Sequence, residues 1–173
     1  MATEEALIDE LRSYNRKIYS HGLECYNVIA NMWALNAARQ GAECGLKEEI
    51  AGTFRSSNQN TKLEVALAGA WGISNYWISS PALNISIIKA KVEDLMKTRL
   101  KKDGRISIKT IFDTLSIAPY GFMPCNLSAF ILGFLLKEYS GGKYTWSDGT
   151  ISDELTLDKM KEMIHEILQQ EKT

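Results

Sequence analysis

A chain of 173 residues is one large domain or two small ones, and its 45% hydrophobic content excludes an intrinsically disordered protein. The formal net charge of −1 gives the chain as a whole no electrostatic attraction to nucleic acid or to an anionic membrane. Three cysteines without a CxxC pair, and only two histidines, argue against a structural zinc site and favour free thiols.

The sequence carries neither the pattern of a signal peptide nor that of a membrane span. The first residues, MATEEALIDELR, are acidic and lack the basic start and apolar run of a signal peptide. The longest apolar run covers residues 130–136, which is far short of a membrane span. We therefore expect a cytoplasmic protein that does not contact the membrane.

The first predicted helix covers residues 3–19. Thr3 is a suitable N-cap, and Glu4 and Glu5 lie in the first turn, where acidic side chains are favoured. His21-Gly22 ends the helix, and His21 fits a position at a helix end better than a catalytic one. Spacings of three and four place the large apolar side chains on one stripe: Leu7, Leu11, Tyr14 and Ile18.

A second helix is predicted over residues 23–39, and it is apolar on nearly all sides, which is typical of a buried central helix. Gly41 and Gly45 are expected to bracket a break before a short helix over 46–54. A polar connector over 55–60 then leads to a helix capped by Thr61, with small residues on one face and three large rings: Trp71, Tyr76 and Trp77.

The next helix begins near Pro81 and ends at Gly104, and the pattern changes after it. The later elements are a helix capped by Ser107, a tight turn at 118–121, an apolar helix opened by Pro124, a hairpin over 143–155 and a last helix capped by Thr156. This order predicts a mainly α fold. A helical region over 1–103 precedes a winged-helix-like unit with a small β-hairpin over 104–173, unless the two form one continuous domain.

No catalytic motif occurs in the sequence. There is no GxxxxGK[ST] phosphate loop, no GxSxG and no HExxH. His165 lies between Glu162 and Glu166 on the last predicted helix, where we expect it to be solvated. We predict a noncatalytic protein with no metal and no cofactor.

Basic residues concentrate between Lys89 and Lys109, where eight of them stand against three acidic residues. Such a run, together with the wing, can neutralise phosphates of nucleic acid. The alternative is that it is only the solvated face of an amphipathic helix. The residues predicted to contact nucleic acid are Lys97, Arg99, Lys101, Lys102, Arg105, Lys109 and Lys143.

The apolar helix after Pro124 occupies the place of a recognition helix, but it carries no lysine or arginine before Lys137. A helix that reads base edges normally carries such residues at its N-terminal end. We therefore expect its outward positions to dock on another protein. These positions are Cys125, Asn126, Ser128, Ala129, Leu132 and Gly133.

The segments LMKTRLKKDG (95–104), IKTIFDTL (108–115) and APYGF (118–122), followed by the apolar helix and the hairpin over 144–149, resemble part of a known family. Over residues 92–167 the chain is similar to the winged-helix-like segment of very large bacterial ATPases of phage-exclusion (BREX-like) defence systems. In that family the segment accompanies a P-loop ATPase domain and is not catalytic. The resemblance thus implies an accessory module.

The sequence therefore predicts a noncatalytic interaction module of a larger bacterial assembly, with a protein partner or a parent ATPase. Nonspecific contact with nucleic acid through the basic run stays open. The alternative is a small-molecule sensor or an enzyme with a pocket lined by Trp71, Tyr76 and Trp77, although aromatic residues at helical spacing more often belong to a core. The oligomeric state is not predicted.

Overall fold

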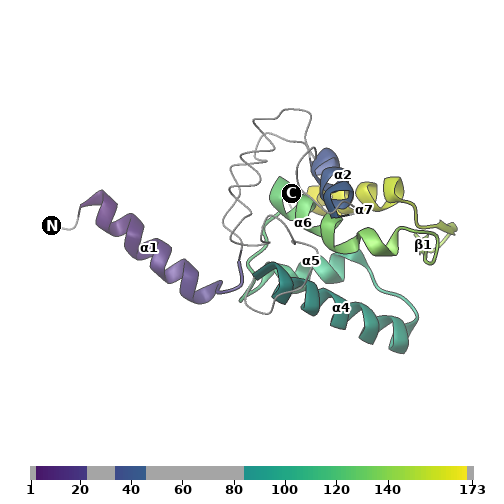
Figure 1. The fold of residues 1–173 in the computed structure, drawn as a ribbon, viewed down its shortest axis with the longest axis horizontal. Coiled ribbons are helices and arrows are strands. Elements are labelled where there is room, and N and C mark those ends of the chain that lie inside the picture. The colour runs from purple at the N-terminus through teal and green to yellow at the C-terminus, as the bar shows by residue number, and fades with distance from the viewer. Residues whose placement is uncertain (1–2, 23–33, 46–83, 171–173) are drawn as a thin grey trace.

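The computed structural model describes residues 3–22, 34–45 and 84–170 (Figure 1). It is mainly helical, with one small antiparallel hairpin near the C-terminus, which confirms the predicted fold class. The described elements are α1 (Glu4–Ile18), α2 (Ala34–Gly45), α4 (Asn84–Asp103), α5 (Ile108–Ser116), α6 (Asn126–Leu136), the 3-10 helix η2 (Lys137–Tyr139), β1 (Thr145–Ser147), β2 (Ser152–Glu154) and α7 (Leu157–Gln170).

Helix α6 is the centre of the fold, and all its residues from 127 to 136 are buried. A helix that is apolar on every side must be covered on every side. Helices α2 and α7 both pack on α6, and α5 packs on α7. Helix α4 contributes four side chains to the same core: Ile85, Ile88, Val92 and Met96.

Helices α2 and α6 approach each other very closely, because both carry glycine or alanine where they cross. A Cβ atom at Gly41 would lie 1.9 Å from the Phe130 carbonyl oxygen, and one at Gly133 would lie 2.0 Å from the Ala38 oxygen. The expected break at Gly41 is therefore wrong, because α2 continues through Gly41 to Gly45. The glycine permits contact between the two helix backbones instead of ending the helix.

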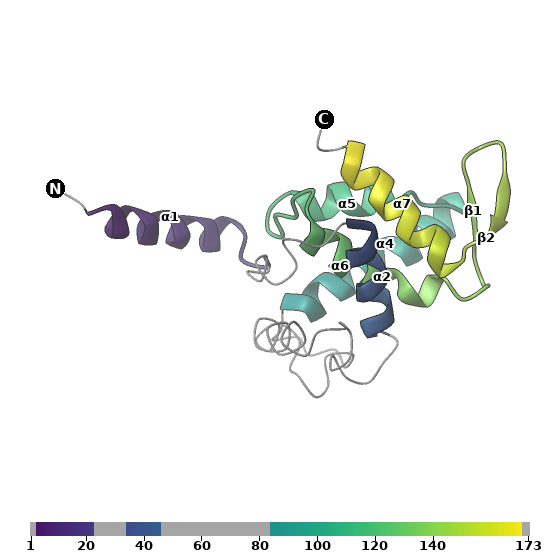
Figure 2. The ribbon, with the colours of Figure 1, turned by 90° about the horizontal axis from the view of Figure 1, so that it is seen from above.

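The same crossing corrects a second prediction, that α6 turns an outward docking face to other proteins. Ala129 and Leu132 are fully buried, and Ser128 and Gly133 are buried as well. Helix α2 of the same chain packs on α6, with Ala38 against Gly133, and it also packs on α7 (Figure 2). Cys125 and Asn126, at the start of α6, are half-buried.

Local signals place the remaining C-terminal elements as predicted. The Ser107 hydroxyl accepts a hydrogen bond from the Thr110 N–H (3.0 Å), and Thr156 accepts one from the Lys159 N–H (3.2 Å), so both caps are confirmed. Residue Gly104 follows α4 with a φ of +66°, in the left-handed region that glycine favours after a helix. In the hairpin, Trp146 lies opposite Asp153.

Helix α1 is set apart from the rest. It begins at the predicted N-cap, where the Thr3 hydroxyl accepts a hydrogen bond from the Ala6 N–H (3.3 Å). Figures 1 and 2 show it extending away from the other described helices, with its C-terminal end nearest to them. No residue of α1 is buried.

Several predicted features lie outside the described residues. These are the first part of the helix over 23–39, the helix over 46–54, the connector over 55–60 and the aromatic side chains Trp33, Trp71, Tyr76 and Trp77. Within the described ranges, no helix combines the length and the apolar character that crossing a bilayer requires.

Candidate interaction surfaces

The apolar stripe of α1 is the largest set of exposed hydrophobic side chains on one described element. Leu7 is 54% exposed, Leu11 56%, Tyr14 59% and Ile18 50%. Ile8 and Tyr19, at the edges of the stripe, are also exposed. Because these side chains share one side of a helix that extends from the fold, they form a continuous apolar surface in contact with water.

The turn at residues 118–121 holds the base of this helix. The His21 N–H donates a hydrogen bond to the Pro119 carbonyl oxygen (3.0 Å). The Tyr19 ring covers Gly121, where a Cβ atom would lie 2.4 Å from the ring. Tyr120 lies beside His21, with 6.0 Å between ring centroids, and burial raises the pKa of the Tyr120 hydroxyl. The predicted tight turn thus anchors α1 at its C-terminal end.

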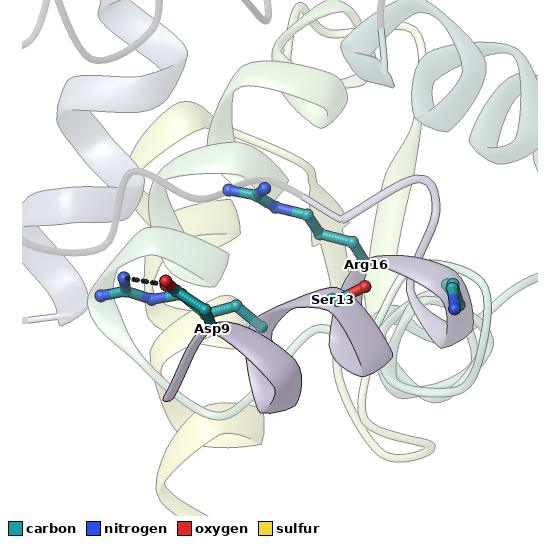
Figure 3. Close-up of a pocket in the computed structure, with 5 residues that line it drawn as sticks. Asp9, Ser13 and Arg16 are labelled. Carbon is teal, nitrogen blue, oxygen red and sulfur yellow. Dashed lines mark ion pairs between the residues drawn. The ribbon is translucent and has the colours of Figure 1, made fainter. Parts of the chain in front are cut away.

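The polar side of α1 carries a shallow hollow of about 400 Å³, which extends to Lys17 at the flank of the stripe (Figure 3). Its described lining comes from this one helix, and Arg12 forms an ion pair with Asp9 across 3.5 Å. A ligand site normally buries most of its ligand between walls from several elements. We therefore interpret the hollow as part of the solvated face of an amphipathic helix and not as a ligand site.

A larger groove of about 1240 Å³ lies between the C-terminal end of α4, the start of α5, the hairpin and α7. Its apolar lining includes Leu100 and Ile111 on one side and Met160 and Met163 on the other. Charged side chains of both signs also line it: Arg99, Arg105, Lys143 and Lys159 are basic, and Asp103, Asp148 and Glu166 are acidic. The mixture gives the groove no strong preference for an anion.

The structure divides the predicted basic residues among several faces. Arg99, Arg105 and Lys143 line the groove, and Arg99 is paired with Asp103 at 3.2 Å. Lys109 lies on α5 and pairs with Asp113 at 3.0 Å. The others, Lys97, Lys101 and Lys102, are exposed and do not line the groove.

Lys159 also lines the groove, although the sequence pattern did not predict it as a site residue. Its ammonium nitrogen lies 4.0 Å from the centroid of the Trp146 ring, which is cation–π geometry. The contact joins β1 to the first turn of α7. This contact depends on how the hairpin is oriented relative to α7. Residues adjacent in the sequence do not determine that orientation, so the contact could not be predicted from a local pattern.

The described residues hold no cluster of three histidine, cysteine or acidic side chains that could bind a metal ion. His165 is half-buried on α7, and its Nδ1 atom is enclosed without a hydrogen-bond partner, so the expectation of a solvated histidine is wrong. His21 Nδ1 is enclosed in the same way at the base of α1, on a different element.

The comparisons with known proteins add no candidate function to these surfaces. No family model, no curated protein and no solved structure matches the chain, so its function must be argued from the stripe on α1 and the groove.

Proposed function

We propose that this chain is a noncatalytic interaction module, which binds a protein partner through the apolar stripe of α1. One observation carries the proposal: Leu7, Leu11, Tyr14 and Ile18 are all at least half exposed on one side of a helix that extends from the fold. Burying the exposed half of each such side chain contributes about 1 kcal/mol. A partner that covers the stripe thus gains several kcal/mol from apolar burial alone.

The physical chemistry of a lone helix points the same way. An isolated helix of 15 residues is marginally stable in water, and most helical stability in proteins comes from packing an amphipathic face. Helix α1 has that face, but no described residue covers it. A partner would therefore stabilise the helix as well as hide its apolar surface. The resemblance of residues 92–167 to an accessory segment of bacterial defence ATPases supports a place in a larger cytoplasmic assembly.

Site-specific photo-crosslinking in the native cell tests the proposal. A photoreactive phenylalanine analogue replaces Leu11 on the stripe, and in a matched variant it replaces Ser13 on the polar side of the same helix. We expect covalent protein adducts from position 11 and few from position 13. Equal labelling from the two positions, or none from either, would contradict docking through the stripe.

Nonspecific contact with nucleic acid is a second candidate. Lys97, Lys101, Lys102 and Arg105 are exposed, and no ion pair joins them to another residue of the described ranges. If they neutralise phosphates, affinity for duplex DNA falls steeply with salt, and the triple change Lys101→Glu, Lys102→Glu, Arg105→Glu abolishes binding. Binding that survives the triple change would remove this candidate.

A further inference from the structure

We propose that the partner of α1 is a second copy of this chain, and that the two α1 helices pair antiparallel along their apolar stripes. The inference rests on the proposed docking role of the stripe and names its occupant. It is carried by the spacing of the stripe, by two charged residues beside it, and by the way α1 leaves the fold.

The stripe has the spacing of a coiled-coil seam. Successive members are four, three and four residues apart, as are alternating a and d positions of a heptad repeat. In an antiparallel pair, Leu7 of one copy packs against Ile18 of the other, and Leu11 packs against Tyr14. Because the pair has twofold symmetry, each contact occurs twice. All four stripe residues are then covered, and none is left over.

The same register creates two ion pairs. Glu10 and Lys17 lie on one flank of the stripe, two turns apart, at equivalent heptad positions. In the antiparallel register, Glu10 of each copy faces Lys17 of the other. Neither side chain is ion-paired within the described part of the chain, although Lys17 lies 5.6 Å from the Tyr14 ring centroid. In a parallel pair, Glu10 would instead face Asn15, which carries no charge.

The arrangement of the fold also favours the antiparallel direction. Among the described residues, the contacts that anchor α1 to the rest of the fold lie at its C-terminal end (Figures 1 and 2). Antiparallel pairing places the two folded bodies at opposite ends of the helix pair, about 22 Å apart along its axis. Parallel pairing would bring both bodies to the same end.

Two helices of 15 residues bury on the order of 1,000 Å² in total, which is below the size of most stable interfaces. We therefore expect a weak, concentration-dependent dimer, with a Kd on the order of tens of micromolar. Self-association of this strength would be visible at high protein concentration and nearly absent at low concentration.

Sedimentation equilibrium of the full chain, from about 5 to 500 μM, tests the inference. The mass is expected to rise from 19.4 kDa toward twice that value as concentration increases. Leu11→Glu should leave a monomer at every concentration, whereas Ser13→Glu on the polar side should dimerise like the wild type. Because both positions are exposed, circular dichroism should show that both variants remain folded.

A charge exchange tests the direction and the register. Glu10→Lys and Lys17→Glu should each weaken self-association roughly tenfold, because each places like charges together twice. An equimolar mixture of these two variants should dimerise again, since every facing pair is then attractive. This recovery is specific to the antiparallel pair.

A chain that stays monomeric throughout, or a dimer that Leu11→Glu leaves intact, would overturn self-pairing. So would charge variants that do not recover when mixed. The chain could instead be monomeric and crosslink from position 11 in cells to a different protein. That result would refute pairing with a second copy, but it would support docking through the stripe. If position 11 also gives no adducts, both proposals fail.

Discussion

The close crossing of α2 and α6 gives the sharpest test of the fold, through the substitution Gly133→Ala. The added Cβ atom would lie 2.0 Å from the Ala38 carbonyl oxygen and 2.8 Å from the carbonyl carbon, whereas ordinary contact begins at 3.4 Å. Both obstructing atoms are backbone, so no side-chain rotation relieves the overlap. The two helices must therefore move apart by about 1 Å or more.

This movement loosens the most buried part of the core. Ala37, Ala38 and Ala129 are fully buried at or beside the crossing, and a gap of this size forfeits a large part of their dispersion energy. Overpacking costs about 3 kcal/mol or slightly more here, at the upper end of its usual range because backbone atoms obstruct, and alanine regains about 1 kcal/mol through its higher helix propensity. The expected net loss is about 2–3 kcal/mol, equivalent to a fall in Tm of roughly 5–10 °C.

Urea denaturation followed by circular dichroism measures the loss. The matched control is Gly141→Ala, where a Cβ atom meets nothing within 4 Å, and its stability should stay within about 0.5 kcal/mol of the wild type. Gly41→Ala should cost about as much as Gly133→Ala, and the double variant should cost less than the sum, because one separation relieves both overlaps. If Gly133→Ala were as stable as Gly141→Ala, α2 would not be seated on α6.

Three further predictions follow from single contacts. The Asp148 carboxylate accepts hydrogen bonds from two backbone N–H groups of the hairpin turn (2.8 Å each), which hold its pKa below the ordinary value for aspartate. Its contribution to hairpin order is therefore present above that ordinary value and is lost as pH falls through the lowered pKa, and NMR titration of the Asp148 carboxyl should show a midpoint below that of an unperturbed aspartate. Lys159→Met removes the cation over Trp146 together with the exposed ion pair to Glu162 (3.7 Å), and it should cost about 0.5–1 kcal/mol in urea denaturation; Glu162→Gln, which removes the ion pair alone, should cost less. An unchanged midpoint for Lys159→Met would refute a stabilising contact with Trp146. Gly121→Ala meets the Tyr19 ring and forces an L side chain to a φ of +69°, so hydrogen exchange at the backbone amides after α1 should accelerate while exchange in α6 stays unchanged.

Elements that are specified by adjacent residues could be predicted from the sequence. The caps at Thr3, Ser107 and Thr156, and the hairpin turn before β2, all depend on side chains that bond to backbone groups within three residues. The helix boundary at Gly104 depends on the conformational freedom of one residue. These local interactions form in the same way whatever the rest of the fold, so the sequence alone is enough to predict them.

Features that depend on another element could not be predicted in this way. A glycine at the end of an apolar segment is typical of a helix end, and only the presence of α6 shows that Gly41 is a contact residue. Leu132 and Gly133 were expected to face outward, but both are buried, and Gly133 lies against the backbone of Ala38 in α2. For the candidate site, the spacing of apolar residues predicted the stripe on α1. That spacing did not predict that the stripe would be exposed to water instead of packed against the fold.

One physical requirement explains both where α2 lies and why α1 is the surface to test. Helix α6 is apolar on every side and is buried from residue 127 to 136, and within the chain α2 packs closely against it. Helix α1 also has an apolar face, but no described residue covers it. The only described anchor of α1 is the turn at 118–121, which holds one end of the helix. That anchor fixes where α1 leaves the fold without covering Leu7 or Leu11. A face that is held in position and left uncovered is suited to binding between molecules, and the spacing of Glu10 and Lys17 makes a second copy its best-matched partner.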